Sequence, residues 1–500
     1  MAIAVMDTIR LMFMMPDGYP HRKKASRNSK VIIYAPTPAH AEGVFCYQQK
    51  GAFYRAGRFS LKKNIYICSR ERRSLAMKEY KKRIADKLLK YRLEEVGAVL
   101  VEGPKWCGKT TTAEQLAKSV LYMADPSTRN SSLEMADLNV RMLLKGDVPR
   151  LIDEWQVIPQ IWDAIRFEVD HRGEEGLFIL TGSSVPVSSE DIHHTGTGRF
   201  AWITMRTMSL WESGDSTGDI SIEQLFKGET DLVGYNSKTL DDIAFLVCRG
   251  GWPSAVAKNH RVALRQAYDY YDAVVKKDIS RVDEVVRSSE RTKLLMRSYA
   301  RSQGAQVSVG AIRQDMMAND DASLADKTVQ SYIGALKKIF VIEDMPAWNP
   351  NLRSRTAIRS AETRYFVDPS IAVAALGLGP EDLVNDLETF GLLFETLCIR
   401  DLRVYADAID GNVYHYRDKN GLECDAVIHL RNGAYGLIEI KLGGATAIEK
   451  GVSTLLSLAS KIDTTKMKSP SFLMVLTAVG DYAYRRKDGV YVVPVGCLRD

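Results

Sequence analysis

One eight-residue stretch, Gly103 to Thr110, constrains the fold of this chain most strongly. Its sequence, GPKWCGKT, fits the pattern G-x-x-x-x-G-K-[ST]. The apolar residues 97–102 before it predict a short strand, and residues 111–120 after it predict a helix. A strand, a glycine-rich turn and a helix in this order direct several backbone N–H groups to one point, at the positive end of a helix dipole. Such a point binds phosphate, so the sequence predicts a nucleotide site.

The expected nucleotide contacts are consecutive in the chain, and ATP and Mg²⁺ are the expected cofactors. Lys109 is placed to meet the β- and γ-phosphates, and the hydroxyl of Thr110 to bind the magnesium ion. The whole predicted set is Gly103, Pro104, Lys105, Trp106, Cys107, Gly108, Lys109, Thr110 and Thr111.

A partner carboxylate is expected at the end of a neighbouring apolar strand. The segment RLIDE, residues 150–154, supplies two candidates about forty residues after the loop. Asp153 would hold Mg²⁺ through water, and Glu154 would orient or activate the attacking water. The alternative is an ordinary surface Asp-Glu pair after a short strand.

Two further candidates follow a third predicted strand, residues 177–180. Ser183 could hydrogen-bond the γ-phosphate or the water as a sensor, or it could simply cap a turn. Arg199, which precedes the strand-like residues 200–205, could act as an arginine finger because a guanidinium forks onto phosphate oxygens. A surface salt bridge is the equally weighted alternative.

The order of these segments resembles a prokaryotic AAA-type ATPase family whose members carry a C-terminal domain of unknown function. The resemblance rests on the P-loop, LIDEWQ, IPQIWDAIR, LFILTGSS, TGRF, MSLWE and the turn RGGWP, and covers approximately residues 77 to 480. It implies a RecA-like core, a small helical lid, a winged-helix segment and a restriction-endonuclease-like terminal domain. Trp106 and Cys107 depart from the smaller or basic residues expected inside the loop, and Trp106 could alter contacts with the base or the lid.

We therefore expect an α/β chain whose P-loop core is a parallel sheet with helices on both faces, followed by a winged-helix segment and an α/β nuclease-like domain. The expected boundaries are an extra segment at 1–76, the core at 77–212, a lid or linker at 213–286, a winged helix at 287–348 and the terminal domain at 349–500.

Residues 1–76 differ from the rest in composition. They hold fourteen Lys or Arg and four Asp or Glu, so their net charge is about +10. The whole chain has a net charge of +6, so the remainder carries about −4. A nucleic-acid-binding tail is one interpretation. The favoured one is that the segment is no part of the fold and that translation begins at Met77, which opens an amphipathic helical stripe.

The predicted winged helix has a thin basic surface. Lys327, Lys337 and Lys338 would lie near phosphates if its second helix entered a major groove. Winged helices also serve as rigid spacers and protein docks, so DNA contact and these other roles remain equal alternatives there.

A second set of chemical residues lies in the last domain. LECDAVIHL and AYGLIEIKLG predict consecutive strands joined by a turn at 431–433. Glu439 and Lys441, two apart, share a strand face, and Asp425 lies on the paired strand. Two carboxylates can bind Mg²⁺ while a lysine holds the attacking water. Glu395 is the expected fourth member, and an inactive remnant of such a site is the alternative.

Two functions from different classes follow. The first is an ATPase coupled to a winged-helix and nuclease-like module acting on nucleic acid. The second is a nucleotide-dependent switch that docks a protein partner and cleaves nothing; a small-molecule kinase fits less well because it leaves residues 260–500 unused. DNA and a second copy of the chain are candidate partners. Scattered cysteines and no long apolar run predict a cytoplasmic protein without a membrane span.

Overall fold

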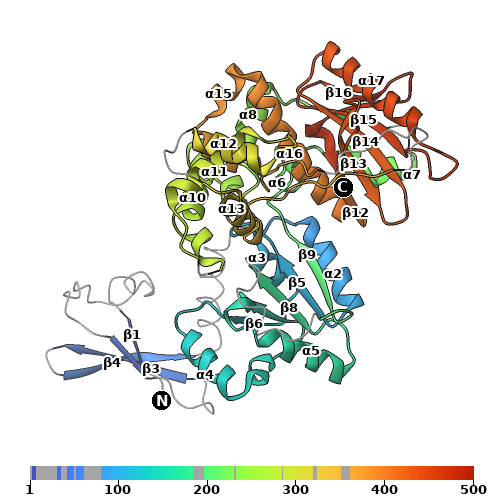
Figure 1. The fold of residues 1–500 in the computed structure, drawn as a ribbon. Coiled ribbons are helices and arrows are strands. Elements are labelled where there is room, and N and C mark those ends of the chain that lie inside the picture. The colour runs from blue at the N-terminus through green and yellow to red at the C-terminus, as the bar shows by residue number, and fades with distance from the viewer. Residues whose placement is uncertain are drawn as a thin grey trace. The chain divides into compact units, whose positions relative to one another are not determined.

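The structure is a computed structural model of the 500-residue chain. It describes residues 3–6, 31–34, 42–49, 52–60, 80–183, 196–229, 232–283, 285–318, 324–350 and 361–500. The chain divides into two compact units, residues 1–80 and residues 81–500. Elements carry the labels of Figure 1.

The first unit contains an antiparallel sheet in which each strand pairs with the next along the chain. Its strands are β1 (Ile3–Met6), β2 (Val31–Tyr34), β3 (Glu42–Gln49) and β4 (Ala52–Ser60). The basic clusters at 21–24 and 70–73 lie outside the described residues. That residues 1–76 are no part of the fold stays a prediction.

The second unit begins with an α/β core built on a parallel sheet of order β6-β7-β8-β5-β9, which confirms the predicted RecA-like class. Successive side chains of the central strands enter opposite cores, one with Leu100, Ile152 and Leu180 and one with Val101 and Ile179. Helices cover both faces, since one core includes residues of α5 and the other residues of α2. The elements are α2 (Ile84–Glu95), β5 (Ala98–Glu102), α3 (Lys109–Glu114), β6 (Ser119–Tyr122), α4 (Arg129–Asn139), η2 (Val140–Leu144), β7 (Arg150–Asp153), η3 (Trp155–Val157), α5 (Ile161–Arg172), β8 (Phe178–Gly182) and β9 (Phe200–Thr204).

The helix expected over residues 111–120 is too long. It ends at Glu114, and residues from Ser119 form β6, which pairs in parallel with β7. The apolar residues Val120 and Leu121 fit both periodicities, and pairing with a neighbouring strand decides between them.

The segment expected to be a helical lid, residues 213–286, contains helices and also two short strands that pair with strands near the end of the chain, and its boundaries stay a prediction. Strand β10 pairs with the last strand, β18, and β11 pairs with β16. Pairings across more than two hundred residues cannot be read from local sequence. The elements are α6 (Leu210–Ser213), β10 (Ile220–Ser221), α7 (Ile222–Lys227), β11 (Gly234–Tyr235), α8 (Leu240–Arg249), α9 (Pro253–Val256), α10 (His260–Ala273), η4 (Val274–Asp278) and η5 (Ile279–Arg281).

Three helices follow: α11 (Ser289–Arg301), α12 (Val309–Met317) and α13 (Asp326–Lys338). Antiparallel bridges then join Ile342 to Phe366 and Met345 to Thr363. We call residues 341–345 and 363–367 the bridge pair. Helices followed by such a pair have the order expected of a winged helix, and that assignment stays a prediction.

The last part is a seven-stranded mixed sheet of order β11-β16-β17-β15-β14-β13-β12, with α16 and α17 packed against it (Figure 1). The predicted hairpin is present as β13 and β14, joined at Gly433. Among the described helices, none combines the length and apolarity needed to cross a bilayer. The elements are α14 (Pro369–Leu376), α15 (Pro380–Asn385), α16 (Leu387–Asp407), β12 (Gly411–Arg417), β13 (Glu423–Leu430), β14 (Tyr435–Lys441), α17 (Ala445–Lys461), β15 (Phe472–Thr477), β16 (Tyr482–Arg485), β17 (Tyr491–Pro494), η6 (Val495–Cys497) and β18 (Leu498–Arg499).

Candidate functional site

The loop between β5 and α3 requires its two glycines. Gly103 has φ +147°, and a Cβ added there would lie 2.0 Å from the backbone oxygen of Met205. Gly108 has φ +104°, in the left-handed region that side chains rarely adopt. The backbone can therefore turn tightly at both ends of the loop, as a phosphate cradle needs.

Lys109 fills this cradle with its ammonium group. Nζ donates to the carbonyl oxygens of Gly103 at 2.9 Å and Pro104 at 2.8 Å, and the side chain is buried. A buried ammonium bound to neutral carbonyls is a favourable place for an anion. The loop thus fits a phosphate chain.

Asp153, at the end of β7, lies against the P-loop helix even though β8 separates β7 from β5 in the sheet. The hydroxyls of Thr110 and Thr181 both donate to Asp153 Oδ1, each at 2.6 Å. The residues expected to hold magnesium, Thr110 and Asp153, are therefore in direct contact. Thr181 joins them from the end of β8, a contact that its place after an apolar strand could have suggested.

Glu154 follows in a left-handed conformation, with φ +57°. Its carboxylate accepts a hydrogen bond from Ser183 Oγ at 3.1 Å and another from the side-chain amide of Gln156. The structure thus brings the predicted sensor and the predicted water-activating residue together. Gln156 had no signal in the sequence beyond its position two residues after Glu154.

Arg199 lies apart from this group within the same chain. Its backbone oxygen accepts from the N–H of Ala98, at the amino end of β5, whereas the P-loop follows the carboxyl end. Five strand residues separate these ends by roughly 16 Å. Arg199 Nε donates to Asp170 at 2.7 Å, and this hydrogen bond lowers the pKa of the Asp170 carboxyl. A finger that acts on this chain's own nucleotide is therefore excluded by position.

The variable residues of the P-loop contact the helical part of the chain. Lys105 Nζ pairs with Asp278, the last residue of the π-helical turn η4, at 2.6 Å. The ring of Trp106 meets the edge of Tyr270 at 5.7 Å between centroids. The unusual Trp106 thus contacts α10, in the segment for which the sequence predicts a lid.

The RGGWP turn is packed against the same loop. A Cβ added to Gly251 would lie 2.1 Å from the carbonyl oxygen of Met208, so this position also requires glycine. The side chain of Pro253 lies beside Gly108, 3.5 Å from an added Cβ there. The two sequence motifs therefore lie next to each other.

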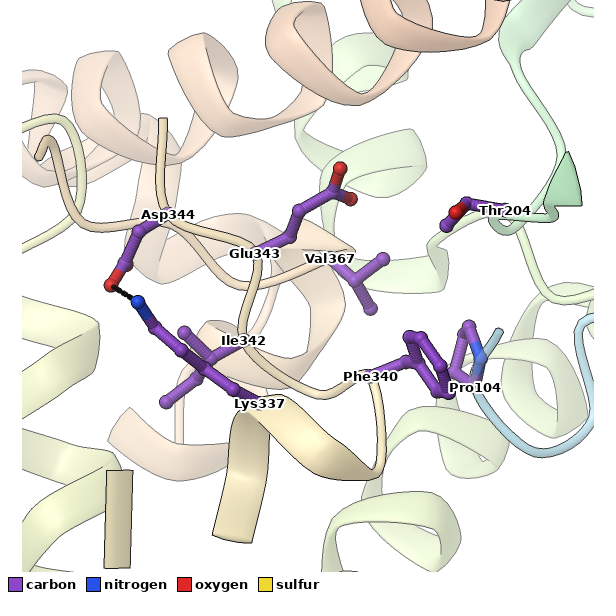
Figure 2. Close-up of a pocket in the computed structure, with 8 residues that line it drawn as sticks. All are labelled: Pro104, Thr204, Lys337, Phe340, Ile342, Glu343, Asp344 and Val367. Carbon is purple, nitrogen blue, oxygen red and sulfur yellow. Dashed lines mark ion pairs between the residues drawn. The ribbon is translucent and has the colours of Figure 1, made fainter. Parts of the chain in front are cut away.

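A cavity of about 310 Å³ lies between the P-loop, the end of β9 and the residues around α13 (Figure 2). It is lined by Pro104, Thr204, Lys337, Phe340, Ile342, Glu343, Asp344 and Val367. Lys337 forms ion pairs with Asp344 and Glu362, each at 2.9 Å. Lys337, one of the three lysines expected to lie near DNA phosphates, is therefore paired with two carboxylates.

A buried ion network joins the core to the other parts beside this cavity. Arg206, two residues after β9, pairs with Glu343 of the bridge pair and with Asp407 of α16, both at 2.6 Å. Burial would raise the pKa of Glu343, but Arg206 and Arg403 lower it to about 2. This network could not be predicted from local sequence, because its members are far apart in the chain.

The C-terminal candidates converge as well. Lys441 Nζ lies 3.0 Å from Asp425 Oδ2 and 2.8 Å from Glu439 Oε2. The backbone N–H of Ile440 also donates to Asp425 Oδ2 at 2.7 Å, which fixes that carboxylate on the paired strand. Both carboxylates therefore face the same ammonium group, as their strand positions predicted.

Glu395, on α16, belongs to the same group electrostatically. Burial and then the charge of Asp425 raise its pKa to about 8, and the same two causes raise the pKa of Glu439 to about 8. The hydroxyl of Tyr365 donates to Glu395 Oε1, and Gly304 lies against the same carboxylate. Tyr365 of the bridge pair and Gly304, which follows α11, thus lie against one side of this cluster. The sequence did not indicate these contacts.

Among the described residues, no three His, Cys, Asp or Glu side chains are arranged to hold a metal ion. A cation at Glu395, Asp425 and Glu439 stays a prediction, as does one at Thr110 and Asp153. One further hydroxyl is notable: Thr477 pairs in register with Lys441, is buried, and has no hydrogen-bond partner among the described residues.

Three segments match protein families. Residues 95–213 match the family described as AAA domain, residues 240–382 a domain of unknown function (DUF8612), and residues 390–498 a domain of unknown function (DUF4143). The chain is 22% identical over 380 residues to uncharacterized proteins of Mycobacterium tuberculosis (Rv2008c) and Mycobacterium bovis (Mb2031c), covering 74% of this chain and 75% of each of them.

Among solved structures, the chain is similar to the Walker-type ATPase PABY2304 of Pyrococcus abyssi, with 12% identity and a TM-score of 0.37, covering 58% of this chain and 94% of that one. The AAA match spans β5, the P-loop, Asp153 and β9. The chain therefore carries an AAA-type P-loop domain, and its last part matches a domain of unknown function, as the resemblance implied.

Proposed function

We propose that the chain binds and hydrolyses ATP with Mg²⁺. The observation that carries the proposal is the 2.6 Å hydrogen bond from Thr110 to Asp153, because it brings the P-loop hydroxyl and the strand-end carboxylate to one point. A magnesium ion beside the β- and γ-phosphates would be held by the hydroxyl of Thr110 and, through water, by the carboxylate of Asp153.

Each residue has a defined task in this proposal. The ammonium of Lys109 leaves the loop carbonyls for the phosphates, and Thr110 and Asp153 hold the metal. Glu154, oriented by Ser183 and Gln156, aligns the attacking water and takes its proton. The bound metal would neutralise charge on the phosphates during transfer.

Two variants separate binding from chemistry. Lys109→Ala removes the charge that meets the phosphates, so a fluorescent ATP analogue should no longer bind measurably. Glu154→Gln keeps the shape but cannot accept a proton, so binding should persist while phosphate release stops. Hydrolysis at the wild-type rate by both variants would contradict the proposal.

We further propose that the C-terminal domain acts on nucleic acid as a nuclease-like module. Asp425, Glu439 and Glu395 would hold a divalent cation, and Lys441 would hold the water that attacks the phosphodiester. The support is the convergence of Asp425 and Glu439 on Lys441 within 3.0 Å. The raised pKa of Glu439 indicates a site that gains from a cation.

The test uses the full chain with Mg²⁺ or Mn²⁺ and a labelled DNA. Asp425→Ala should abolish metal-dependent cleavage and leave ATP turnover intact. Ser457→Ala, on the exposed side of α17, is a matched control that should alter neither activity. Cleavage that persists in Asp425→Ala would show that this cluster is not a nuclease site.

One observation favours the second candidate, a nucleotide-dependent switch without cleavage. Tyr365 donates to Glu395, and its neighbour Arg364 pairs with Asp344 at 2.6 Å, next to the Arg206–Glu343 pair at the core. Contacts therefore run from the end of β9 to the C-terminal carboxylates, as a switch would use. Nucleotide-dependent assembly with a protein partner, and no effect of DNA on ATP turnover, would favour this candidate.

A further inference from the structure

The ammonium group of Lys441 lies between the two carboxylates that a cation in the C-terminal cluster would need. Its Nζ is 3.0 Å from Asp425 Oδ2 and 2.8 Å from Glu439 Oε2. The backbone N–H of Ile440 fixes Asp425, and the side chain of Glu439 is buried, so neither carboxylate is free to turn away. Two positive charges at such distances repel each other strongly. The side chain of Lys441 must therefore move if a divalent cation is to bind these oxygens.

Thr477 lies beside Lys441 on the neighbouring strand. Strands β14 and β15 are parallel, with Glu439 level with Val475 and Lys441 level with Thr477. Residues at one level of adjacent strands point to the same face of a sheet. A Cβ added to Gly451 of α17 would lie 3.3 Å from Glu439 Cβ and 3.3 Å from a methyl carbon of Val475, so both residues face α17. Lys441 and Thr477, two residues further along each strand, share that face.

The hydroxyl of Thr477 is unsatisfied. The residue is buried, and its Oγ1 has no hydrogen-bond partner within the part of the chain that the structure describes. Thr396 of α16, which is equally buried, donates to the backbone oxygen of Leu392 at 3.1 Å. Buried hydroxyls are usually hydrogen-bonded in this way, because an unmade bond is unfavourable. A hydroxyl oxygen also accepts hydrogen bonds, so Thr477 offers a vacant acceptor next to Lys441.

We propose that Thr477 accepts the ammonium group of Lys441 when a divalent cation binds Asp425 and Glu439. Thr477 is then a positioning residue of the C-terminal cluster. The flexible four-carbon stem of lysine allows Nζ to turn from the carboxylates to the next strand while its backbone stays in place. The inference rests on the proposed nuclease-like function and adds that the cluster is closed by its own lysine until a cation displaces it. Held by Thr477, Lys441 stays close enough to hold the attacking water.

The test is Mn²⁺ binding to the full chain, measured from the paramagnetic resonance of free Mn²⁺ without ATP or DNA. Asp425→Ala identifies the binding at this cluster, because it leaves Thr110 and Asp153 unchanged. Thr477→Val keeps the shape but removes the acceptor, and should weaken that binding roughly tenfold, the worth of a hydrogen bond to a charged group. Thr477→Ser keeps the hydroxyl and should bind as the wild type does. Thr446→Val, at an exposed position in the first turn of α17, is the matched control.

Lys441→Met should have the opposite effect, because it removes the competing ammonium group. Mn²⁺ should then bind at least about fivefold more tightly than to the wild type. Adding Thr477→Val to Lys441→Met should change nothing further, since no ammonium group needs an acceptor. A purely structural role of Thr477 would weaken binding in both backgrounds. Wild-type Mn²⁺ affinity in Thr477→Val, or an equal loss with and without Lys441, would overturn the inference.

Thermal unfolding in EDTA gives a second measurement. Thr477→Val should melt no lower than the wild type, because it removes a buried hydroxyl that has no partner in the cation-free state. A lower melting temperature, or failure to fold, would show that the hydroxyl is already used there and would overturn the inference.

The binding data also separate this inference from the proposed function. Mn²⁺ binding that Asp425→Ala leaves unchanged would remove the metal centre, and the inference with it. Binding that needs Asp425 but is indifferent to Thr477 would overturn the inference alone.

Discussion

The carboxylate of Asp153 accepts two hydroxyl hydrogen bonds on one oxygen, from Thr110 and Thr181. A buried carboxylate is stable only when it is hydrogen-bonded or paired with a cation. The two hydroxyls supply that stabilisation and leave the group ready for a metal. At the scale of single residues, the nucleotide site is therefore held in shape by its own side chains.

Glu154 depends in the same way on Ser183 and Gln156. Ser183→Ala or Gln156→Ala should release the carboxylate, and misplacing a water-orienting group by about 1 Å costs roughly 100-fold in rate. We expect kcat for ATP to fall by about 10- to 100-fold with nucleotide affinity unchanged. Gln160→Ala, at an exposed position one turn further on, is the control. Wild-type kcat in both variants would show that Glu154 is placed by its backbone alone.

The lowered pKa of Glu343 predicts how the free energy of unfolding depends on pH. Its pKa is about 2 in the folded chain and 4.5 in its ordinary state, so the folded protein favours the charged form. The stabilisation is complete above pH 4.5 and is lost as the pH falls from 4.5 through 2. At most about 3 kcal/mol follows from a shift of this size.

Glu343→Gln should therefore lower the free energy of unfolding at pH 7, and the difference from the wild type should shrink as the pH falls below 4.5. Denaturant unfolding of both proteins at several pH values measures this. Glu362→Gln, which removes a more exposed partner of Lys337, should show a much smaller difference. A Glu343→Gln difference that is independent of pH would contradict the assignment of Arg206 as its partner.

At the scale of elements, local sequence predicted the parts that local rules control. The strand-turn-helix of the P-loop, the strand ending in Asp153 and the β13–β14 hairpin all have short-range signals, namely glycine positions and apolar runs. Asp425, Glu439 and Lys441 could be placed together for the same reason, since strand alternation fixes their faces.

Long-range contacts could not be predicted in this way. The pairing of β10 with β18, the contact of Lys105 with Asp278 and the Arg206 network each join distant segments, and no periodicity records them. The sequence predicts a helix over residues 111–120 because the apolar positions near its end fit two patterns, whereas residues from Ser119 form a strand. Arg199 shows a similar limit: its sequence context suits a finger, but only the sheet direction places it away from the P-loop of its own chain.

Arg199 can act as a finger only on a neighbouring copy, so its effect should appear in mixtures. Arg199→Ala should lower turnover more than nucleotide binding. Mixed with Glu154→Gln, it should regain part of the activity, because one kind of interface in the mixture combines an intact Glu154 with an intact Arg199. Arg172→Ala, which breaks a nearby surface ion pair, is the control. No recovery in the mixture would leave Arg199 as the Asp170 salt bridge alone.

At the scale of the whole molecule, the boundary between the two compact units falls at residues 80 and 81, close to the predicted start at Met77. A chain that starts at Met77 retains α2, whose Ile84 and Leu89 are buried, and every residue given a chemical role. It should unfold at the same temperature and hydrolyse ATP at the same rate as the full chain. A marked fall in melting temperature would show that residues 1–76 stabilise the second unit.

The most direct test of the account is the steady-state rate of phosphate release from ATP by the full chain in Mg²⁺, with and without single-stranded DNA. We predict turnover that depends on Glu154 and rises when DNA is added, because the core and the C-terminal domain are joined through Arg206. The absence of turnover under both conditions would contradict the central claim that this AAA-type domain is an ATPase coupled to a nucleic-acid module.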